Sequence, residues 1–216
     1  RPPRSTLDRS SAASDVYKRQ EYKKAMLSLD KRVDEVYMNK NQELLWLLKH
    51  PNLYTGGISA PDNELIDKNK FPVFKTNRGG KWTFHGDGQK VVYFVMNLNK
   101  RDKAIRGFVN KIEDTIISTL NELDIESFKD KNNIGIWVKQ NNLEQKIAAI
   151  GIKVKKWIAY HGFSININVN KSNYEGIIPC GIKKKGIANI SDFKKNIDEE
   201  IIDNIIIKNF SKVFQD

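Results

Sequence analysis

The stretch KIAAIGIKVKKWIAYHGFSININV, from Lys146 to Val169, decides the fold class of this 216-residue chain. It holds two strand-like segments in succession. Its final part, FSININV, alternates apolar and polar residues with the two-residue period of a half-buried strand. No helical pattern separates the two segments, so we expect them to form a hairpin in an antiparallel part of a sheet.

Other patterned segments surround this hairpin. Apolar residues at three- and four-residue spacing predict helices over 21–39, 103–123 and 191–214, the last with a stripe of Phe193, Ile197, Ile201, Ile205 and Phe210. Apolar runs predict strands over 43–49, 71–75, 90–98 and 134–139, and prolines and glycines predict a long loop after Pro51. Because no regular βαβ alternation is present, we expect an α+β fold: one domain with a mixed, largely antiparallel sheet flanked by helices.

Composition narrows the function classes. No apolar run approaches the ~20 residues that span a bilayer, which excludes a membrane protein. The single cysteine, Cys180, excludes an internal disulfide framework and a multi-thiolate zinc site, and it suits a reducing compartment, so we expect a cytoplasmic protein.

The first twenty residues differ from the rest because they are rich in arginine and serine, whereas lysine replaces arginine afterwards. We interpret residues 1–20 as a foreign or disordered leader and residues 21–216 as the catalytic domain. The leader holds five basic and two acidic residues, which leaves +8 of the +11 net charge for the domain. That excess suits an acidic protein partner, and no clustered arginine or known motif supports nucleic-acid binding.

Two segments carry possible chemistry. RGGKWTFHGDGQ, Arg78 to Gln89, surrounds a histidine with glycines that allow a close backbone approach, although it is neither a phosphate loop nor a dinucleotide fingerprint. Cys180 lies in IIPCGIKKKG, where a sharp turn and Lys183, Lys184 and Lys185 favour a thiolate. The alternatives are a turn-rich connector and an inert buried cysteine. His50, His85 and His161 show no metal-ligand spacing, so we expect no metal.

Four motifs in order resemble the lipoyl(octanoyl) transferases of lipoate biosynthesis. They are HPNLYTGG, RGGKWTFHG, the hairpin quoted above and IIPCGI, which together cover nearly the whole chain after Glu21. Asp87 departs from the family pattern, which commonly has proline there, and Lys49 replaces a frequent glutamate.

The resemblance implies a biotin/lipoate-protein-ligase-like fold and no cofactor. It implies transfer of an octanoyl group from octanoyl-acyl carrier protein to a lysine of the lipoyl domains of 2-oxoacid dehydrogenases or of the glycine-cleavage H protein. The catalytic residues fall on Cys180, the nucleophile, and Lys146, its partner. The substrate-binding residues fall on Arg78, Gly79, Gly80, Lys81, Trp82, Thr83, Phe84, His85, Ala149, Ile150, Gly151, Gly162, Phe163 and Ser164.

Within this interpretation, Gly79, Gly80, Gly151 and Gly162 are expected to leave an apolar slot that Phe84, Ile150 and Phe163 line. Two alternatives remain open. One is an ATP-dependent lipoate-protein ligase, which does not need Cys180. The other is a cysteine-dependent thioester hydrolase that uses His85 or His161 as its base.

Overall fold

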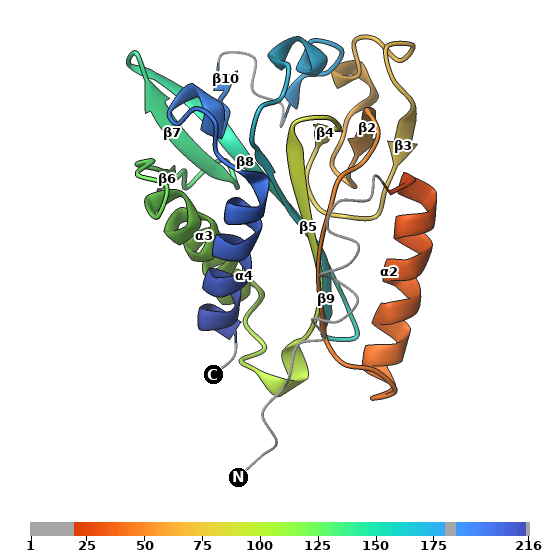
Figure 1. Ribbon diagram of the computed structural model, residues 1–216. Helices are drawn as coiled ribbons and strands as arrows, with labels where there is room; N and C mark the ends of the chain where they lie inside the picture. Colours follow the sequence, from red (N-terminus) through yellow and green to blue (C-terminus); the bar gives the residue numbers. More distant parts are fainter. Residues whose placement is uncertain (1–19, 180–184, 215–216) are drawn as a thin grey trace.

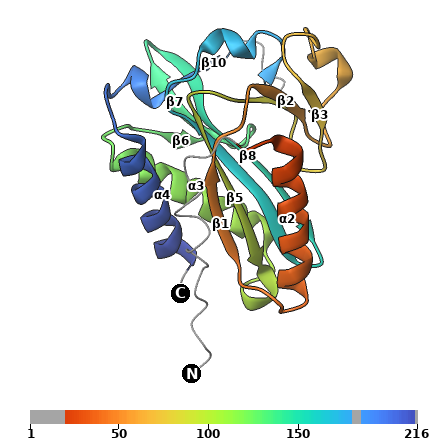
Figure 2. The same ribbon diagram turned by 45° about the vertical axis from the view of Figure 1, so that its right-hand side comes forward.

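The structure is a computed structural model, and it describes residues 20–179 and 185–214. A twisted sheet forms the middle layer, with helix α2 on one face and helices α3 and α4 on the other (Figure 1). The helices are α2 (Tyr22–Tyr37), α3 (Ile105–Asn121) and α4 (Glu199–Phe214). Figure 2 shows the same arrangement turned by 45°, with α2 and α4 separated by the sheet. No helix in the described parts of the chain has both the length and the apolar content to cross a bilayer.

The main sheet has the order β1-β5-β9-β8-β7-β6, and β10 pairs with β8 in parallel while the other neighbours are antiparallel. Its strands are β1 (Leu44–Leu48), β5 (Gln89–Asn97), β6 (Phe128–Lys129), β7 (Ile136–Gln140), β8 (Leu143–Lys155), β9 (Ile158–Asn166) and β10 (Gly186–Ile187). The predicted mixed, largely antiparallel sheet flanked by helices is confirmed.

The core lies on both faces of this sheet. Val92, Phe94 and Met96 of β5 pack toward α3 and α4, whereas Val91 and Tyr93 pack toward α2. This alternation follows from the two-residue period of a strand, and it explains why all nine residues of β5 are buried.

A second, smaller sheet was not expected. β2 (Leu53–Gly56) pairs in parallel with β3 (Val73–Lys75) and antiparallel with β4 (Trp82–His85). The long loop predicted after Pro51 is therefore wrong, because it contains β2, and the glycine-punctuated segment after Arg78 contains β4. Four-residue strands between prolines and glycines are too short to show a period.

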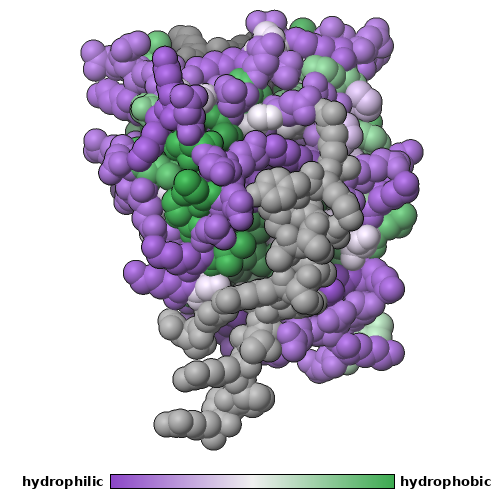
Figure 3. Space-filling model, viewed as in Figure 1, coloured by the Kyte–Doolittle hydropathy of each residue, from purple (hydrophilic) through white to green (hydrophobic). Residues whose placement is uncertain are grey.

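The C-terminal helix begins later than predicted. A 3-10 turn, Ile190–Asp192, follows a capping box at Asn189, and α4 starts only at Glu199. The predicted stripe is correct only in part: Phe210 is buried, and Ile197 and Ile205 pack partly buried against the core, whereas Phe193 is 39% exposed and Ile201 52%. α4 also buries Ile202, Ile206 and Phe214. Figure 3 shows hydrophobic surface gathered over this part of α3 and α4.

The position of β7 leaves part of β8 with a free edge. β7 pairs with β8 only from Leu143 to Ala148, so the half of β8 from Ala149 onward has β9 as its single strand neighbour within the described residues. On the outer side of this half, the Gly79 N–H donates to the Ile152 carbonyl at 3.1 Å. This edge is where the cleft described next is formed.

Candidate active site

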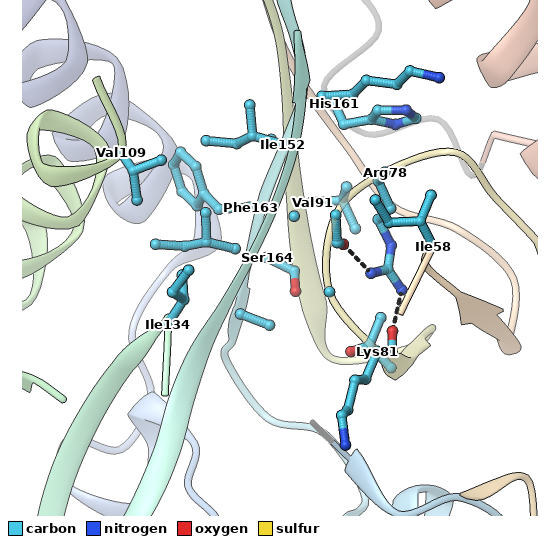
Figure 4. Close-up of a pocket in the computed structure, with 18 of the residues that line it drawn as sticks. Ile58, Arg78, Lys81, Val91, Val109, Ile134, Ile152, His161, Phe163 and Ser164 are labelled. Carbon is cyan, nitrogen blue, oxygen red and sulfur yellow. Dashed lines mark hydrogen bonds between the residues drawn. The ribbon is translucent and has the colours of Figure 1, made fainter. Parts of the chain in front are cut away.

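A cleft of about 870 Å³ surrounds the free edge of β8 and reaches both faces of the sheet. In Figure 4, Val109, Ile134, Ile152 and Phe163 lie on the side of α3, and Ile58, Arg78, Lys81 and His161 lie on the opposite side. The first side is apolar and the second carries most of the polar groups. The two sides meet at the edge of β8.

The structure brings most of the sequence-predicted residues to this cleft. It is lined by Lys146 and by Arg78, Gly79, Gly80, Lys81, Trp82, Thr83, His85, Ala149, Ile150, Gly151, Gly162, Phe163 and Ser164. Phe84 does not line it. The Phe84 ring is fully buried in an aromatic cluster with Tyr54, Phe71 and Tyr174. Cys180, Lys183 and Lys184 lie outside the described residues.

The four glycines of the predicted slot, with Ile150 and Phe163, line the cleft, but Gly151 and Gly162 also allow close packing. A Cβ at Gly151 would lie 2.9 Å from Arg78 Cδ and 3.2 Å from the Gly79 carbonyl, so these residues already pack against each other. A Cβ at Gly162 would collide with the Val92 carbonyl of the neighbouring strand. Gly151 and Gly162 therefore allow neighbouring groups to pack closely against the backbone of β8 and β9. Ile150 and Phe163, expected to line the same slot, lie on the face toward α3.

A different opening crosses the face toward α2. Ala149 lies directly opposite Ser164, and Gly151 directly opposite Gly162, so the four form a strip of small side chains across β8 and β9; we call it the small-residue strip. Val91 and Tyr93 continue the strip on β5. Arg78 packs over the Gly151 end of the strip, Ala149 and Ser164 line the cleft, and Tyr22 of α2 lines it from the other side.

Arg78 holds the loop that borders the strip. Its guanidinium donates to the Thr55 carbonyl and hydroxyl at 2.8 Å each, to the Lys81 carbonyl at 3.0 Å and to the Gly79 carbonyl at 2.9 Å. Gly80 adopts φ +86°, a conformation that favours glycine. The arginine thus fixes the backbone from Gly79 to Lys81 beside β8.

Lys146 is buried at the other end of the edge, with 5% exposure. It lies directly opposite Trp137 of β7, and its Nζ is 4.6 Å from the centre of the Trp137 ring system. Nζ also donates to the Ile134 carbonyl at 3.0 Å. These contacts hold the ammonium group at the cleft wall.

The three histidines have neutral rings that hold neighbouring groups. His50 donates from Nδ1 to the Gln20 carbonyl and accepts from the Tyr93 hydroxyl. Gln89 donates from Nε2 to the Phe84 carbonyl, so its Oε1 accepts from His85 Nδ1 at 2.7 Å. His161 donates to Asn77. Burial, the largest cause, lowers the pKa of His50 to about 4 and those of His85 and His161 to about 3.

These pKa values predict acid sensitivity of the fold. The unfolded chain binds protons on its histidines below about pH 6.5, whereas the folded chain does so only near pH 4 to 3, so stability falls across this window as pH falls. Each histidine contributes about 2 kcal/mol to the loss at pH 5. Urea unfolding at pH 7 and pH 5 measures it, and His161→Gln should reduce the loss. Equal unfolding free energies at the two pH values would show that these rings are protonated in the fold.

Two further residues of the cleft were missed at the level of sequence. Tyr22 and Tyr93 line its polar side, and burial raises the pKa of Tyr22 to about 12 and that of Tyr93 well above its ordinary value. Both hydroxyls therefore stay protonated. In the sequence each belongs to an ordinary apolar pattern, so no signal separates them from core residues.

The cleft has a one-sided charge. Among the described residues that line it are Arg78, Lys81, Lys146 and Lys153, and no aspartate or glutamate. Lys81 forms an ion pair at 2.8 Å with Glu64, which does not line the cleft. No three His, Cys, Asp or Glu side chains in the described ranges lie close enough to share a metal ion. The site is therefore suited to binding an acidic or anionic partner through its own side chains.

A family model for the lipoyl protein ligase A/B catalytic domain matches residues 21–211. The chain belongs to this family. An octanoyltransferase of Ehrlichia ruminantium (strain Gardel) is 46% identical over 194 residues, 89% of this chain and 93% of that protein. An octanoyltransferase of Wolbachia sp. subsp. Brugia malayi is 41% identical over 194 residues, 89% and 94% of the two chains. Their shared name places this member of the lipoyl protein ligase A/B family among the acyltransferases.

Solved structures of the lipoyl protein ligase type share the fold. A bipartite lipoate protein ligase of Thermoplasma acidophilum, studied with its E2 lipoyl domain, superposes with a TM-score of 0.70 at 15% identity, covering 92% of this chain and 83% of that one. A lipoate-protein ligase A bound with ATP gives 0.70 at 16% identity, covering 92% and 85%. The predicted lipoate-ligase-like fold is thus confirmed.

Proposed function

We propose that this protein transfers an octanoyl group from octanoyl-acyl carrier protein to a lysine of lipoyl domains, through a thioester on Cys180. The octanoyltransferase name of its relatives supports the acyl group. The observation that carries the mechanism is the buried Lys146, which contacts the Ile134 carbonyl and the Trp137 ring at the wall of the cleft.

The chain near Cys180 supports its pairing with Lys146. Lys185 follows Cys180 by five residues, a reach of at most about 18 Å. Its Nζ lies 4.5 Å from the Trp137 ring centre that Lys146 also contacts. Two residues later, Ile187 pairs with Lys146 across β10 and β8. Lys185 and Ile187 thus lie beside the proposed partner lysine, and they follow Cys180 by five and seven residues.

The reaction proceeds in two acyl transfers. The Cys180 thiolate attacks the thioester carbonyl of the donor, a new C–S bond forms, and the C–S bond to the pantetheine breaks; the leaving thiolate takes the proton of the Lys146 ammonium. The acceptor amine then attacks the Cys180 thioester, a C–N bond forms, the C–S bond breaks, and neutral Lys146 takes the amine proton. A thioester becomes an amide, so no ATP is needed.

The acyl chain is proposed to lie over the small-residue strip. Burying six methylenes at ~0.8 kcal/mol each gives about 5 kcal/mol, enough to select a medium chain. The cationic lining suits the carrier protein and the lipoyl domain, because both are typically acidic, and the remaining positive charge of the domain assists docking.

The hydrolase alternative is disfavoured by the histidines. A general base works best with a pKa near the operating pH. The pKa values of His85 and His161, about 3, make both rings weak bases. Cys180 in turn disfavours the ligase, because activation by ATP needs no enzyme thioester.

The experiment mixes the protein with octanoyl-acyl carrier protein and an unmodified lipoyl domain, without ATP, and measures the mass of the lipoyl domain. We expect a gain of one octanoyl group on its lysine. Free octanoate with an unmodified lipoyl domain would indicate the hydrolase. Modification that occurs only with free octanoate and ATP would indicate the ligase.

The small-residue strip predicts control of chain length. Ala149→Leu should lower the rate with octanoyl donors by about tenfold or more and favour shorter chains, because overpacking a filled space costs about 1–3 kcal/mol. Ile165→Leu is the matched control, since Ile165 lies in the core of the neighbouring strand β9 and does not line the cleft, and the substitution conserves volume. Rates with butanoyl, octanoyl and dodecanoyl carrier protein measure the preference. An unchanged preference in Ala149→Leu would place the chain elsewhere.

A further inference from the structure

We propose that Trp137 is the positioning residue of Lys146, and that its ring face, not only its volume, sets where the Lys146 proton is given and taken. The inference rests on the proposed function, since it assigns a role in the reaction of Lys146. Nothing in the sequence motifs singled out Trp137, which reads there as an ordinary strand residue.

The geometry carries the proposal. Trp137 is 1% exposed and lies opposite Lys146 at a β-bulge, where β7 shifts register between Ile136 and Trp137. Its Nε1–H donates to the Asn133 carbonyl at 3.0 Å, which fixes the plane of the indole. Two ammonium groups then approach the ring system, Lys146 at 4.6 Å and Lys185 at 4.5 Å. A significant cation–π contact occurs about once per 70–80 residues, and here two ammonium groups share one buried ring.

The kind of contact on each lysine differs in a way that suits the reaction. Lys185 pairs with the carboxylates of Asp130 at 2.7 Å and Glu144 at 2.6 Å, and these raise its pKa, so it remains charged. Lys146 contacts the indole and the Ile134 carbonyl, and each of these two groups attracts an ammonium without itself carrying a negative charge. A proton held this way is oriented and still transferable.

The backbone next to Trp137 is shaped for the same side chain. Gly135 has φ +129°, and a Cβ there would lie 2.7 Å from the Ala148 carbonyl and 3.2 Å from both Cε and Nζ of Lys146. The absent side chain thus leaves the space through which Lys146 reaches Ile134. The glycine and the indole together define one path for the lysine side chain.

The experiment compares Trp137→Leu, Trp137→Phe, Lys146→Met and the matched control Trp157→Leu. The Lys103 ammonium lies 5.5 Å from the centre of the Trp157 ring, and Trp157 does not line the cleft. Cys180 is the single thiol of the chain, so alkylation measured against pH reports on that thiol alone. The rate of octanoyl transfer from the preformed acyl-enzyme to a lipoyl domain is measured for the same variants, and circular dichroism checks that each is folded.

We expect Trp137→Leu to shift the alkylation curve to higher pH, most of the way toward that of Lys146→Met, and to slow the transfer step about 30-fold, the factor that matches a desolvated cation–π contact. Trp137→Phe retains a ring face and should shift the curve less, and Trp157→Leu should match the wild type.

Two results would overturn the inference. One is a wild-type alkylation curve and transfer rate in Trp137→Leu while Lys146→Met is shifted. The other is an equal effect of Trp137→Phe and Trp137→Leu, which would assign the effect to volume or to the Asn133 bond. If Lys146→Met itself leaves the curve unchanged, the pairing of Lys146 with Cys180 in the proposed function fails, which is a separate outcome.

Discussion

Replacing Lys146 with methionine is expected to lower the rate of octanoyl transfer by about 10²- to 10⁴-fold, the range that general acid–base catalysis contributes. The substitution keeps the length of the buried side chain and removes its charge and its proton. Capture of the acyl group should fall less than its transfer to the acceptor, because the thiolate can form without help at higher pH, whereas the acceptor amine still needs a base.

The same variant should raise the pKa of the Cys180 thiol, because a neighbouring ammonium stabilises the thiolate. Alkylation of Cys180 would then require higher pH than in the wild type. Lys155→Met is the control, since Lys155 lies on the same strand, is about half exposed and pairs with Asp34 outside the cleft. Identical alkylation curves for wild type and Lys146→Met would show that Lys146 is only a buried strand residue.

The largest effect on stability is expected at the buried pair of Lys90 and Asp203. Lys90 is fully buried in β5, and its Nζ lies 2.8 Å from Asp203 Oδ2 and 3.5 Å from Glu199 Oε2, both on α4. Lys90→Met leaves Asp203 without its buried cation, whereas Glu199 keeps its pair with Lys49 at 2.6 Å. The loss should be about 3–5 kcal/mol of unfolding free energy, because an uncompensated charge remains in the core.

Urea unfolding measures this loss at pH 7. The double variant Lys90→Met with Asp203→Leu should recover most of it, since the unpaired charge is removed, and Lys155→Met should lose at most about 1 kcal/mol because its pair is exposed. A loss in Lys90→Met no greater than in Lys155→Met would mean that α4 is held by its apolar contacts alone.

Strong periodicity explains which elements were predictable. The helix after Tyr22, the buried strand β5 and the hairpin of β8 and β9 each repeat over several periods, and each was predicted within a few residues of its observed bounds. β2 and β4 have only four residues each, so glycine and proline around them gave the stronger signal.

The prediction of the buried stripe on the C-terminal helix failed for a different reason. Isoleucines crowd the sequence from Ile201 to Ile207, so a four-residue spacing fits two stripes one residue apart. Only packing against α3 and the sheet selects the stripe that contains Ile202 and Ile206. The misplaced Phe84 has a similar origin, because its ring packs against Tyr54, Phe71 and Tyr174, which are distant in the sequence.

The site was predictable where motifs are contiguous. Segments 78–85, 149–151 and 162–164 come from distant parts of the sequence, and register pairing brings the last two directly opposite each other beside the first. Trp137, Tyr22 and Tyr93 depend on which strand or helix faces the cleft, which is decided by tertiary packing. Their substrate contacts, like the part of Cys180 in the reaction, remain predictions.

The intact mass of the protein after mixing with octanoyl-acyl carrier protein tests the central claim most directly. We predict a gain of one octanoyl group, located on Cys180 by peptide mapping, which disappears when an unmodified lipoyl domain is added and is absent in Cys180→Ala. An unchanged mass in the wild type while the lipoyl domain still becomes octanoylated, or transfer by Cys180→Ala at the wild-type rate, would contradict the thioester mechanism.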